Sequence, residues 1–259
     1  MTEGHPLPPA MAERARAFTG PPVQARPAAT VVLLRPAAES LEAYVLRRAK
    51  GMAFGGVYAF PGGRVDPDDR PETVRTDWAD LLGVPDAEAR AVVGAAVREL
   101  FEEAGVLLAD DARGDVIAGL QEEGWEADRV AVLRRELRMA DLLERRGLRM
   151  RDDLLHPWGR WVTPDFEPRR FDTWFFVAAL PVGQTAEDVS GESDGVAWIR
   201  PGDTAGLTML PPTRLTLRSL SAYRSIEEVF AEKRNAAVPV QPRVELTDDG
   251  GAMLRVERM

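Results

Sequence analysis

The order of the expected elements along the sequence indicates an α+β fold in which a mixed β-sheet lies between helices. Two stretches with strand character come first, a long amphipathic helix follows, and further strands lead to a helix near the carboxyl end. This order is typical of a layered domain, and a chain of 259 residues can bury the core of one domain with extensions.

The first half of the chain is expected to place two strands ahead of a glycine-rich loop. The strands are apolar runs with β-branched residues or period-two alternation, and proline-rich or Asp-rich segments flank them. The expected elements are a flexible proline-rich arm with at most one short helix at 1–27, strands at 30–34 and 42–47, a loop at 51–63, and a surface excursion at 64–86 with a short helix near 73–82.

The second half alternates between period-3.6 and period-two patterns. Proline and threonine mark the start of the last helix, and an Asp-Asp-Gly-Gly run marks a turn in the tail. The expected elements are helices at 87–104, 128–147 and 213–234, strands at 158–164, 171–180 and 196–200, and a hairpin over 238–258 that turns at 248–251.

Three carboxylates on the helix at 87–104 are the first candidates for a functional site. Glu99, Glu102 and Glu103 are three and four residues apart, so they share one helix face, while apolar residues occupy the opposite face. Like charges this close repel one another, and a hard divalent cation such as Mg²⁺ or Mn²⁺ would stabilise them. The alternative is a solvated acidic face without a ligand, which is the usual reason for a charge cluster.

The residues around these glutamates resemble a known motif. The run Arg98-Glu99-Leu100-Phe101-Glu102-Glu103-Ala104-Gly105-Val106 resembles the second half of the Nudix box, and Phe60-Pro61-Gly62-Gly63 resembles its opening loop. The step from Gly63 to Arg98 is longer than the usual one of about fourteen residues, which indicates an insertion of roughly 21 residues. The early glutamate of the box, eight residues before the arginine, falls on Arg90, so it is missing or replaced, with Glu88 as a candidate.

Further segments resemble one branch of the Nudix hydrolases, the coenzyme A diphosphatases of the peroxisomal type. That branch has an insertion within the box, and the resemblance covers roughly residues 28–225. The coenzyme A signature upstream of the box is only partly present, because Met52 stands where it has an arginine. The matching segments are Trp161-Val-Thr-Pro164, Arg169-Arg-Phe-Asp-Thr-Trp-Phe-Phe176 and Leu210-Pro-Pro212.

The resemblance implies a Nudix-type α/β/α sandwich with a mixed sheet, a C-terminal helix and a hairpin. It divides the chain into the arm at 1–27, a hydrolase domain at 28–205 with the insertion at about 64–86, and a C-terminal extension at 206–259 packed on that domain. The implied activity is metal-dependent cleavage of the pyrophosphate in a nucleoside diphosphate linked to another moiety. Coenzyme A or acyl-coenzyme A would give 3′,5′-ADP and (acyl-)phosphopantetheine.

The resemblance also implies roles for individual residues. Glu102 and Glu103 would be metal ligands with the Gly62 carbonyl close by, Glu99 would be a ligand or the catalytic base, and Arg98 would orient Glu102 or Glu103. A further metal ligand is expected from the acidic loop at 187–195, where Glu192 fits best and Glu187 and Asp188 compete. The expected substrate-binding residues are Arg47, Phe60 and Arg169 or Arg170, although either of these last two could instead pair with Asp172.

Composition limits the partners. A net charge of −9 argues against a nucleic-acid backbone as the main partner, which leaves a small nucleotide-type substrate. The absence of cysteine excludes disulfides, thiol catalysis and thiolate metal sites. No secretory signal or apolar run of membrane-spanning length is visible, so a cytoplasmic protein is expected without a membrane partner.

Three alternatives stay open at this stage. The same chemistry could act on NADH, ADP-ribose or a nucleotide sugar, and the domain could be a regulatory one that binds a ligand without turnover. A homodimer, formed through the N-terminal arm or the insertion, is also possible on the sequence alone.

Overall fold

The fold is built on one large mixed sheet. The computed structural model describes residues 2–49, 51, 55–120, 124–188, 191, 193–248 and 251–257. The main path of the sheet has the order β10-β3-β2-β9-β8, with β4 on β3 and β5 on β2. Its strands are β2 (Arg26–Ala37), β3 (Ser40–Arg48), β4 (Tyr58–Ala59), β5 (Gly62–Arg64), β8 (His156–Val162), β9 (Phe171–Ala179) and β10 (Ser193–Ile199).

A parallel pair lies at the centre of the sheet and antiparallel pairs lie on both sides. Strand β2 pairs in parallel with β9 from Arg26↔Phe171 to Leu34↔Ala179, whereas β3, β8 and β10 join antiparallel neighbours. Successive residues of a strand point to opposite faces, so both central strands supply two cores. The expected mixed sheet and α+β class are confirmed.

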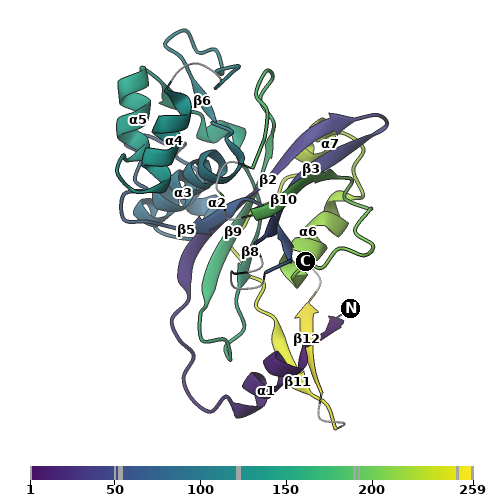
Figure 1. Ribbon diagram of the computed structural model, residues 1–259. Coiled ribbons are helices and arrows are strands. Elements are labelled where there is room, and N and C mark those ends of the chain that lie inside the picture. The colour runs from purple at the N-terminus through teal and green to yellow at the C-terminus, as the bar shows by residue number, and fades with distance from the viewer. Residues whose placement is uncertain are drawn as a thin grey trace.

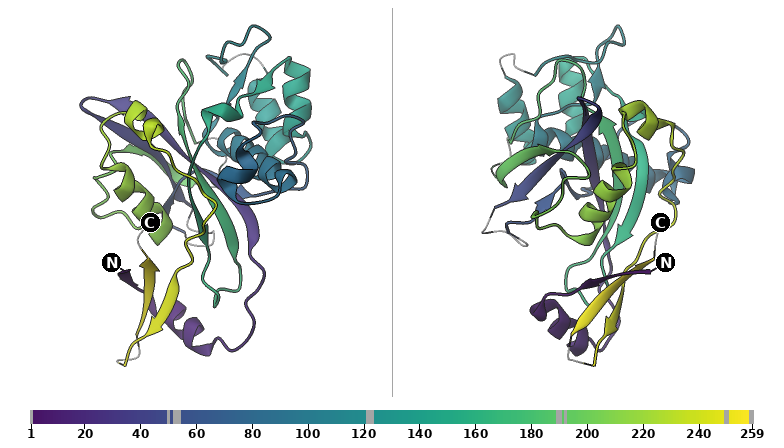
Figure 2. Two further views of the ribbon diagram at one scale, coloured as in Figure 1. Left: turned by 180° about the vertical axis from the view of Figure 1, so that it is seen from behind. Right: turned by 90° about the vertical axis from the view of Figure 1, so that its right-hand side faces the viewer.

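Helices cover both faces of this sheet (Figures 1 and 2). The two layers of helices lie on opposite sides of the sheet in Figure 1 and in the left view of Figure 2, and each packs on a separate cluster of buried apolar side chains. The first layer holds α2 (Trp78–Leu82), α3 (Asp86–Ala104), α4 (Trp125–Leu133) and α5 (Met139–Arg146), and the second holds α6 (Pro211–Leu220) and α7 (Ile226–Ala231).

Helix α3 runs close to the range expected from the sequence. Pro85 precedes its first residue, and Gly105 ends it with a φ of 65°, a left-handed conformation that glycine adopts without a steric penalty. The Gly105 N–H donates to the Phe101 carbonyl and closes the last turn. Most of the helix is buried, including Glu99 and Glu102 near its carboxyl end, whereas Glu103 is half-buried.

Two helices expected to be continuous are interrupted. The expected helix at 128–147 is α4 and α5, broken at Arg135, whose φ of 62° cannot belong to a right-handed helix. The expected helix at 213–234 is α6 and α7, and the Ser225 side chain caps the second by accepting from the Glu228 N–H. His156, expected in a loop, is the first residue of β8.

The two ends of the chain meet in a second, three-stranded sheet of order β1-β12-β11. The first 27 residues, expected as an arm with at most one short helix, hold the helix α1 (Pro9–Ala17) and also the strand β1 (Thr2–Pro6). Strand β1 pairs with β12 (Ala252–Glu257), which forms the expected C-terminal hairpin with β11 (Arg243–Leu246). This sheet and α1 lie together at one end of the molecule (Figure 1).

The remaining elements are short. They are β6 (Ala109–Asp110), β7 (Arg149–Met150) and the 3₁₀ turn at Asp152–Leu154. Within the described part of the chain, no helix has the length and apolar character required to cross a membrane.

Candidate active site

The three glutamates of α3 face one cavity of about 440 Å³, where the end of α3 meets the sheet. Strands β2, β5 and β9 and the α4–α5 connection form the other walls. The lining residues are Ala28, Thr30, Arg48, Gly62, Gly63, Arg64, Asp66, Glu99, Glu102, Glu103, Leu133, Arg135, Phe171 and Thr173.

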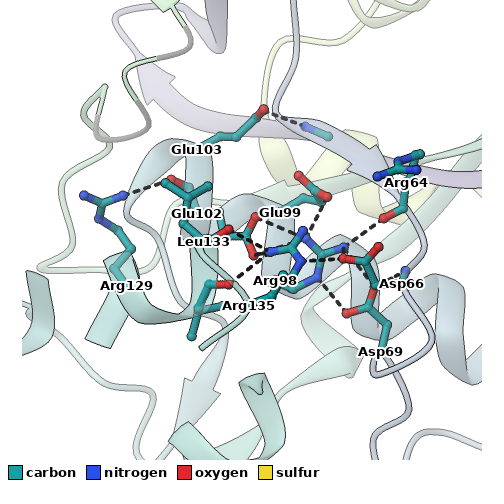
Figure 3. Close-up of polar contacts among 12 residues, drawn as sticks. Arg64, Asp66, Asp69, Arg98, Glu99, Glu102, Glu103, Arg129, Leu133 and Arg135 are labelled. Atoms are coloured by element: carbon teal, nitrogen blue, oxygen red, sulfur yellow. Dashed lines mark hydrogen bonds and ion pairs between the residues drawn. The ribbon is translucent and has the colours of Figure 1, made fainter. Parts of the chain in front are cut away.

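Arg98 is the fixed centre of the acidic cluster (Figure 3). Its Nε and Nη2 donate to the two carboxylate oxygens of Asp69 at 2.7 and 2.8 Å, a bidentate pair in which both side chains are buried. Its Nη1 donates to Glu99 at 2.7 Å and to Glu102 at 3.2 Å, and Nη2 also donates to the Arg64 carbonyl at 2.8 Å. The expected contact between Arg98 and Glu102 is present, and every nitrogen of Arg98 has a partner.

The charge of Arg98 is secured by these contacts. Burial by itself lowers the pKa of Arg98, but the hydrogen bond with Asp69 and the negative charges of Glu99, Asp69 and Glu102 raise it above its ordinary value. The guanidinium therefore stays protonated and positions Glu99 and Glu102.

Burial perturbs the carboxyl of Glu99. Burial raises its pKa to about 7, with Arg98 opposing the shift and the charge of Glu102 adding to it. A carboxyl in this state can gain or lose a proton near neutral pH, and an added cation would favour its ionised form.

Two glycines of β5, Gly62 and Gly63, approach α3 closely. The Gly62 N–H donates to Glu103 Oε2 at 2.9 Å, so this contact uses the amide of Gly62, whereas the sequence indicated a role for its carbonyl. A Cβ on Gly63 would lie 2.5 Å from Glu99 Oε1 and 2.8 Å from Oε2, which is too close. Glycine is therefore required at 63 for Glu99 to occupy its present position.

Arg135 reaches the same carboxylates from the α4–α5 connection (Figure 3). Its Nη1 donates to Glu102 Oε1 and its Nε to Asp66 Oδ2, the latter at 2.5 Å. The Glu102 side chain is 3% exposed and that of Arg135 45% exposed, so one partner is fixed and the other borders solvent.

The donor set fits a hard divalent cation by its chemistry. Three carboxylates of one cavity supply oxygen ligands of the kind that Mg²⁺ and Mn²⁺ prefer. In their present rotamers, no three His, Asp or Glu side chains of the described residues form a group that could hold an ion. In this arrangement Glu102 is paired with Arg98 and Arg135.

The predicted carboxylate from the 187–195 loop cannot be placed, because Glu192 lies outside the described residues. Of its two competitors, Asp188 accepts a hydrogen bond from the Ser193 hydroxyl at 2.6 Å, and the Glu187 backbone N–H donates to the Ala104 carbonyl at the end of α3. Burial and the negative charges of Asp188, Glu103 and Glu187 raise the pKa of Tyr44 on β3.

The residues predicted to bind substrate do not gather around the cavity. Arg47 pairs with Asp194 at 2.5 Å, and Arg169 is exposed. Phe60 is buried against Phe175 on the α6 side of the sheet, where it belongs to the core.

Arg170 has a structural position. It donates to the Val23 and Thr163 carbonyls and pairs with Asp165 at 2.6 Å, so it fastens the N-terminal segment to the β8–β9 turn. The alternative pairing of Arg170 with Asp172 is wrong, because Asp172 pairs with Arg160 at 2.6 Å.

Sequence reasoning missed Asp69 as the carboxylate that holds Arg98. The early carboxylate was sought eight residues before Arg98, but Arg90 there pairs with Asp86 and donates to the Glu72 carbonyl. Asp69 lies six residues after Gly63, where the usual spacing places it when counted forward from the glycine. The extra residues therefore lie between Asp69 and Arg98, and counting from both ends of the motif would have found Asp69.

Comparison with solved structures finds proteins of similar fold. No protein-family model matches the sequence. A NUDIX hydrolase from Alicyclobacillus acidocaldarius superimposes with a TM-score of 0.67 and 28% sequence identity, over 83% of this chain and 99% of that one. An Ap4A hydrolase from C. elegans matches with a TM-score of 0.41 and 14% identity over 76% of this chain and 96% of its own. At that level of similarity, the second match has no bearing on the substrate.

The α/β/α sandwich with a glutamate-bearing helix against a Pro-Gly-Gly loop defines the class of protein as that of the Nudix fold. The Alicyclobacillus hydrolase has this fold over nearly its whole length. Together with the Arg98–Val106 motif, this match supports a Nudix hydrolase.

Proposed function

We propose that the protein uses Mg²⁺ or Mn²⁺ to hydrolyse the pyrophosphate of a nucleoside diphosphate linked to another moiety. The observation that carries this proposal is the joint cavity of Glu99, Glu102, Glu103, Gly62 and Gly63. It combines oxygen donors that suit a hard cation with two glycines of β5, whose backbone a phosphate can approach closely.

The residues of the cavity would have different roles in this reaction. A bound divalent ion would neutralise charge on the phosphates and activate water. Glu102 and Glu103 would hold it, and Glu99 would be a further ligand or would accept the proton of the attacking water. Arg98, fixed by Asp69, keeps Glu99 and Glu102 in place during the reaction. The water oxygen forms a bond to phosphorus as the bridging phosphorus–oxygen bond breaks.

Coenzyme A or acyl-coenzyme A is the substrate that we favour. The support is the stretch 169–176, which resembles the coenzyme A diphosphatases and spans the start of β9. Phe171 and Thr173 from this stretch line the acidic cavity, so the resemblance extends to the wall of the site. The products would be 3′,5′-ADP and (acyl-)phosphopantetheine. A cytoplasmic location and a homodimer are further parts of this proposal.

The test is mass spectrometry of the products after incubation with Mg²⁺ or Mn²⁺ and coenzyme A, NADH, ADP-ribose or a nucleotide sugar. We expect 3′,5′-ADP from coenzyme A, with activity at least about a hundredfold lower in Glu103→Gln. Cleavage of another compound would retain the chemistry and exclude coenzyme A. Tight binding of a compound without any cleavage would favour a regulatory domain.

A further inference from the structure

Arg135 differs from Arg98 in how firmly it is held, although both donate to Glu102. Arg98 is buried and all its nitrogens are engaged, with Asp69, Glu99, Glu102 and the Arg64 carbonyl. The Arg135 side chain is 45% exposed and borders the cavity. Moving Arg98 would leave several buried carboxylates without a cation, whereas Arg135 can rotate towards solvent without breaking up the cluster.

The backbone at Arg135 is unusual for a residue with a side chain. Its φ of 62° lies in the left-handed region, where glycine or asparagine is easier to accommodate. Backbone hydrogen bonds already fix this turn, since the Arg135 N–H donates to the Val132 carbonyl and the Glu136 and Leu137 N–H groups donate to Ala131. The turn therefore does not require arginine, and the strained position instead directs a guanidinium at the cavity.

The present partners of Arg135 are those that a bound cation would also take. Its Nη1 donates to Glu102 and its Nε to Asp66, and both acids line the cavity with Glu103 and Glu99. A divalent ion on Glu102 would repel a guanidinium bound to the same carboxylate. A phosphate placed at the ion would offer the guanidinium a new anionic partner, and arginine binds phosphate well through two parallel hydrogen bonds.

We propose that Arg135 exchanges partners during substrate binding. In the free enzyme its guanidinium stands in for the cation on Glu102 and Asp66, and in the complex it binds a phosphate oxygen of the substrate. This inference rests on the proposed function and adds to it a phosphate-binding residue on the α4–α5 connection.

The exchange predicts that Arg135→Gln raises the affinity for Mn²⁺ and lowers the affinity for pyrophosphate. Without a competing guanidinium, Mn²⁺ alone should bind about fivefold more tightly. With the phosphate partner lost, inorganic pyrophosphate in the presence of Mg²⁺ should bind roughly ten- to a hundredfold more weakly. Mn²⁺ binding can be measured by electron paramagnetic resonance and pyrophosphate binding by calorimetry. A purely structural role would weaken both ligands together.

Two variants serve as controls. Arg138→Gln removes an exposed arginine from the same connection, one that pairs with Asp141, and should change neither affinity. Arg135→Lys keeps the charge and should leave Mn²⁺ affinity near that of the wild type while weakening pyrophosphate binding by less than Arg135→Gln does.

Failure of either expected change in affinity overturns the exchange. Unchanged or weaker Mn²⁺ binding by Arg135→Gln contradicts the stand-in role, and unchanged pyrophosphate binding contradicts the phosphate contact. If the wild type binds and hydrolyses normally in these cases, only the exchange fails. If the wild type binds no Mn²⁺ at all, the proposed function fails with it.

Discussion

Glu99 shows how a single residue can lower the stability of the fold while it serves the site. Its carboxyl is buried, and burial raises its pKa to about 7 although Arg98 donates to it. The unfolded chain has this carboxyl in water with an ordinary pKa near 4.5. The folded state therefore favours the protonated form, and stability is lost as the pH rises from about 4.5 through 7.

Glu99→Gln should remove this loss because glutamine does not ionise and can still accept the Arg98 hydrogen bond. The unfolding free energy of the variant should exceed that of the wild type by roughly 1 kcal/mol at pH 5, and the difference should grow to about 3 kcal/mol at pH 8. Urea unfolding with a chelator present measures this difference. Added Mn²⁺ should reduce it by stabilising the wild type. A difference independent of pH would contradict the assigned environment of Glu99.

Prediction from the sequence succeeded at the residue scale where helix spacing alone decides the outcome. Glu99, Glu102 and Glu103 line one cavity because residues three and four apart share a helix face. Arg170 and Phe60 were predicted from a chemistry that suits a substrate, and the strand register and the turn at 163–170 direct their side chains away from the acidic cavity. Burial and orientation of this kind depend on the tertiary structure.

At the scale of the elements, the segment after β5 supplies Asp69, the carboxylate that binds Arg98 of α3. Asp69 lies in the loop between β5 and α2, and its side chain both accepts from Arg98 and accepts the Asp66 N–H at 2.7 Å. One side chain thus shapes the loop and fixes the arginine of the helix. The 28 residues between Asp69 and Arg98 leave this contact intact.

Replacing Asp69 tests this link between loop and helix. Asp69→Asn leaves a buried guanidinium without its bidentate partner, so it should cost roughly 3 kcal/mol of unfolding free energy and most of the hydrolase activity. Arg90→Gln is the matched control, because its ion pair with Asp86 is exposed and should contribute less than about 1 kcal/mol. Equal losses for the two variants, measured by urea unfolding, would show that Asp69 has no special role.

The helix breaks explain which elements the sequence could not resolve. A period-3.6 pattern continues across 128–147, yet the chain turns at Arg135, where φ is 62° and backbone hydrogen bonds to the Val132 and Ala131 carbonyls close the turn. The hydrophobic periodicity of the sequence reports the apolar face of both helices, and it does not indicate a turn between them. The five long strands of the main sheet and α3 were predicted well, because burial on the sheet gives each of them an uninterrupted pattern, whereas the short strands β4 and β5 fall in or next to the segment expected as a loop.

At the scale of the whole molecule, the two chain ends form a structure that no local pattern indicates. Strand β1 pairs with β12, from Thr2↔Glu257 to Pro6↔Met253, at the far end of the sequence. The tail was recognised as a hairpin from its turn, but its third strand comes from a segment whose prolines suggested an arm. The division into arm, hydrolase domain and extension remains a prediction.

The layered architecture connects this framework to the site. The central β2–β9 pair separates two cores, and the cavity opens where β2, β5 and β9 meet the end of α3. Arg98 and the glutamates proposed to act therefore stand on α3, whereas Arg135 comes from the α4–α5 connection. This contrast underlies the proposed exchange of partners.

The central claim is cation-dependent attack of water on a pyrophosphate held by the glutamates of α3. The most direct measurement is hydrolysis of coenzyme A in ¹⁸O-labelled water, with Mg²⁺ or with a chelator, by the wild type and Glu103→Gln. We expect one ¹⁸O atom in one phosphate product, only with the cation, and a rate at least about a hundredfold lower in the variant. Turnover that persists with the chelator, or a variant as fast as the wild type, would contradict the account.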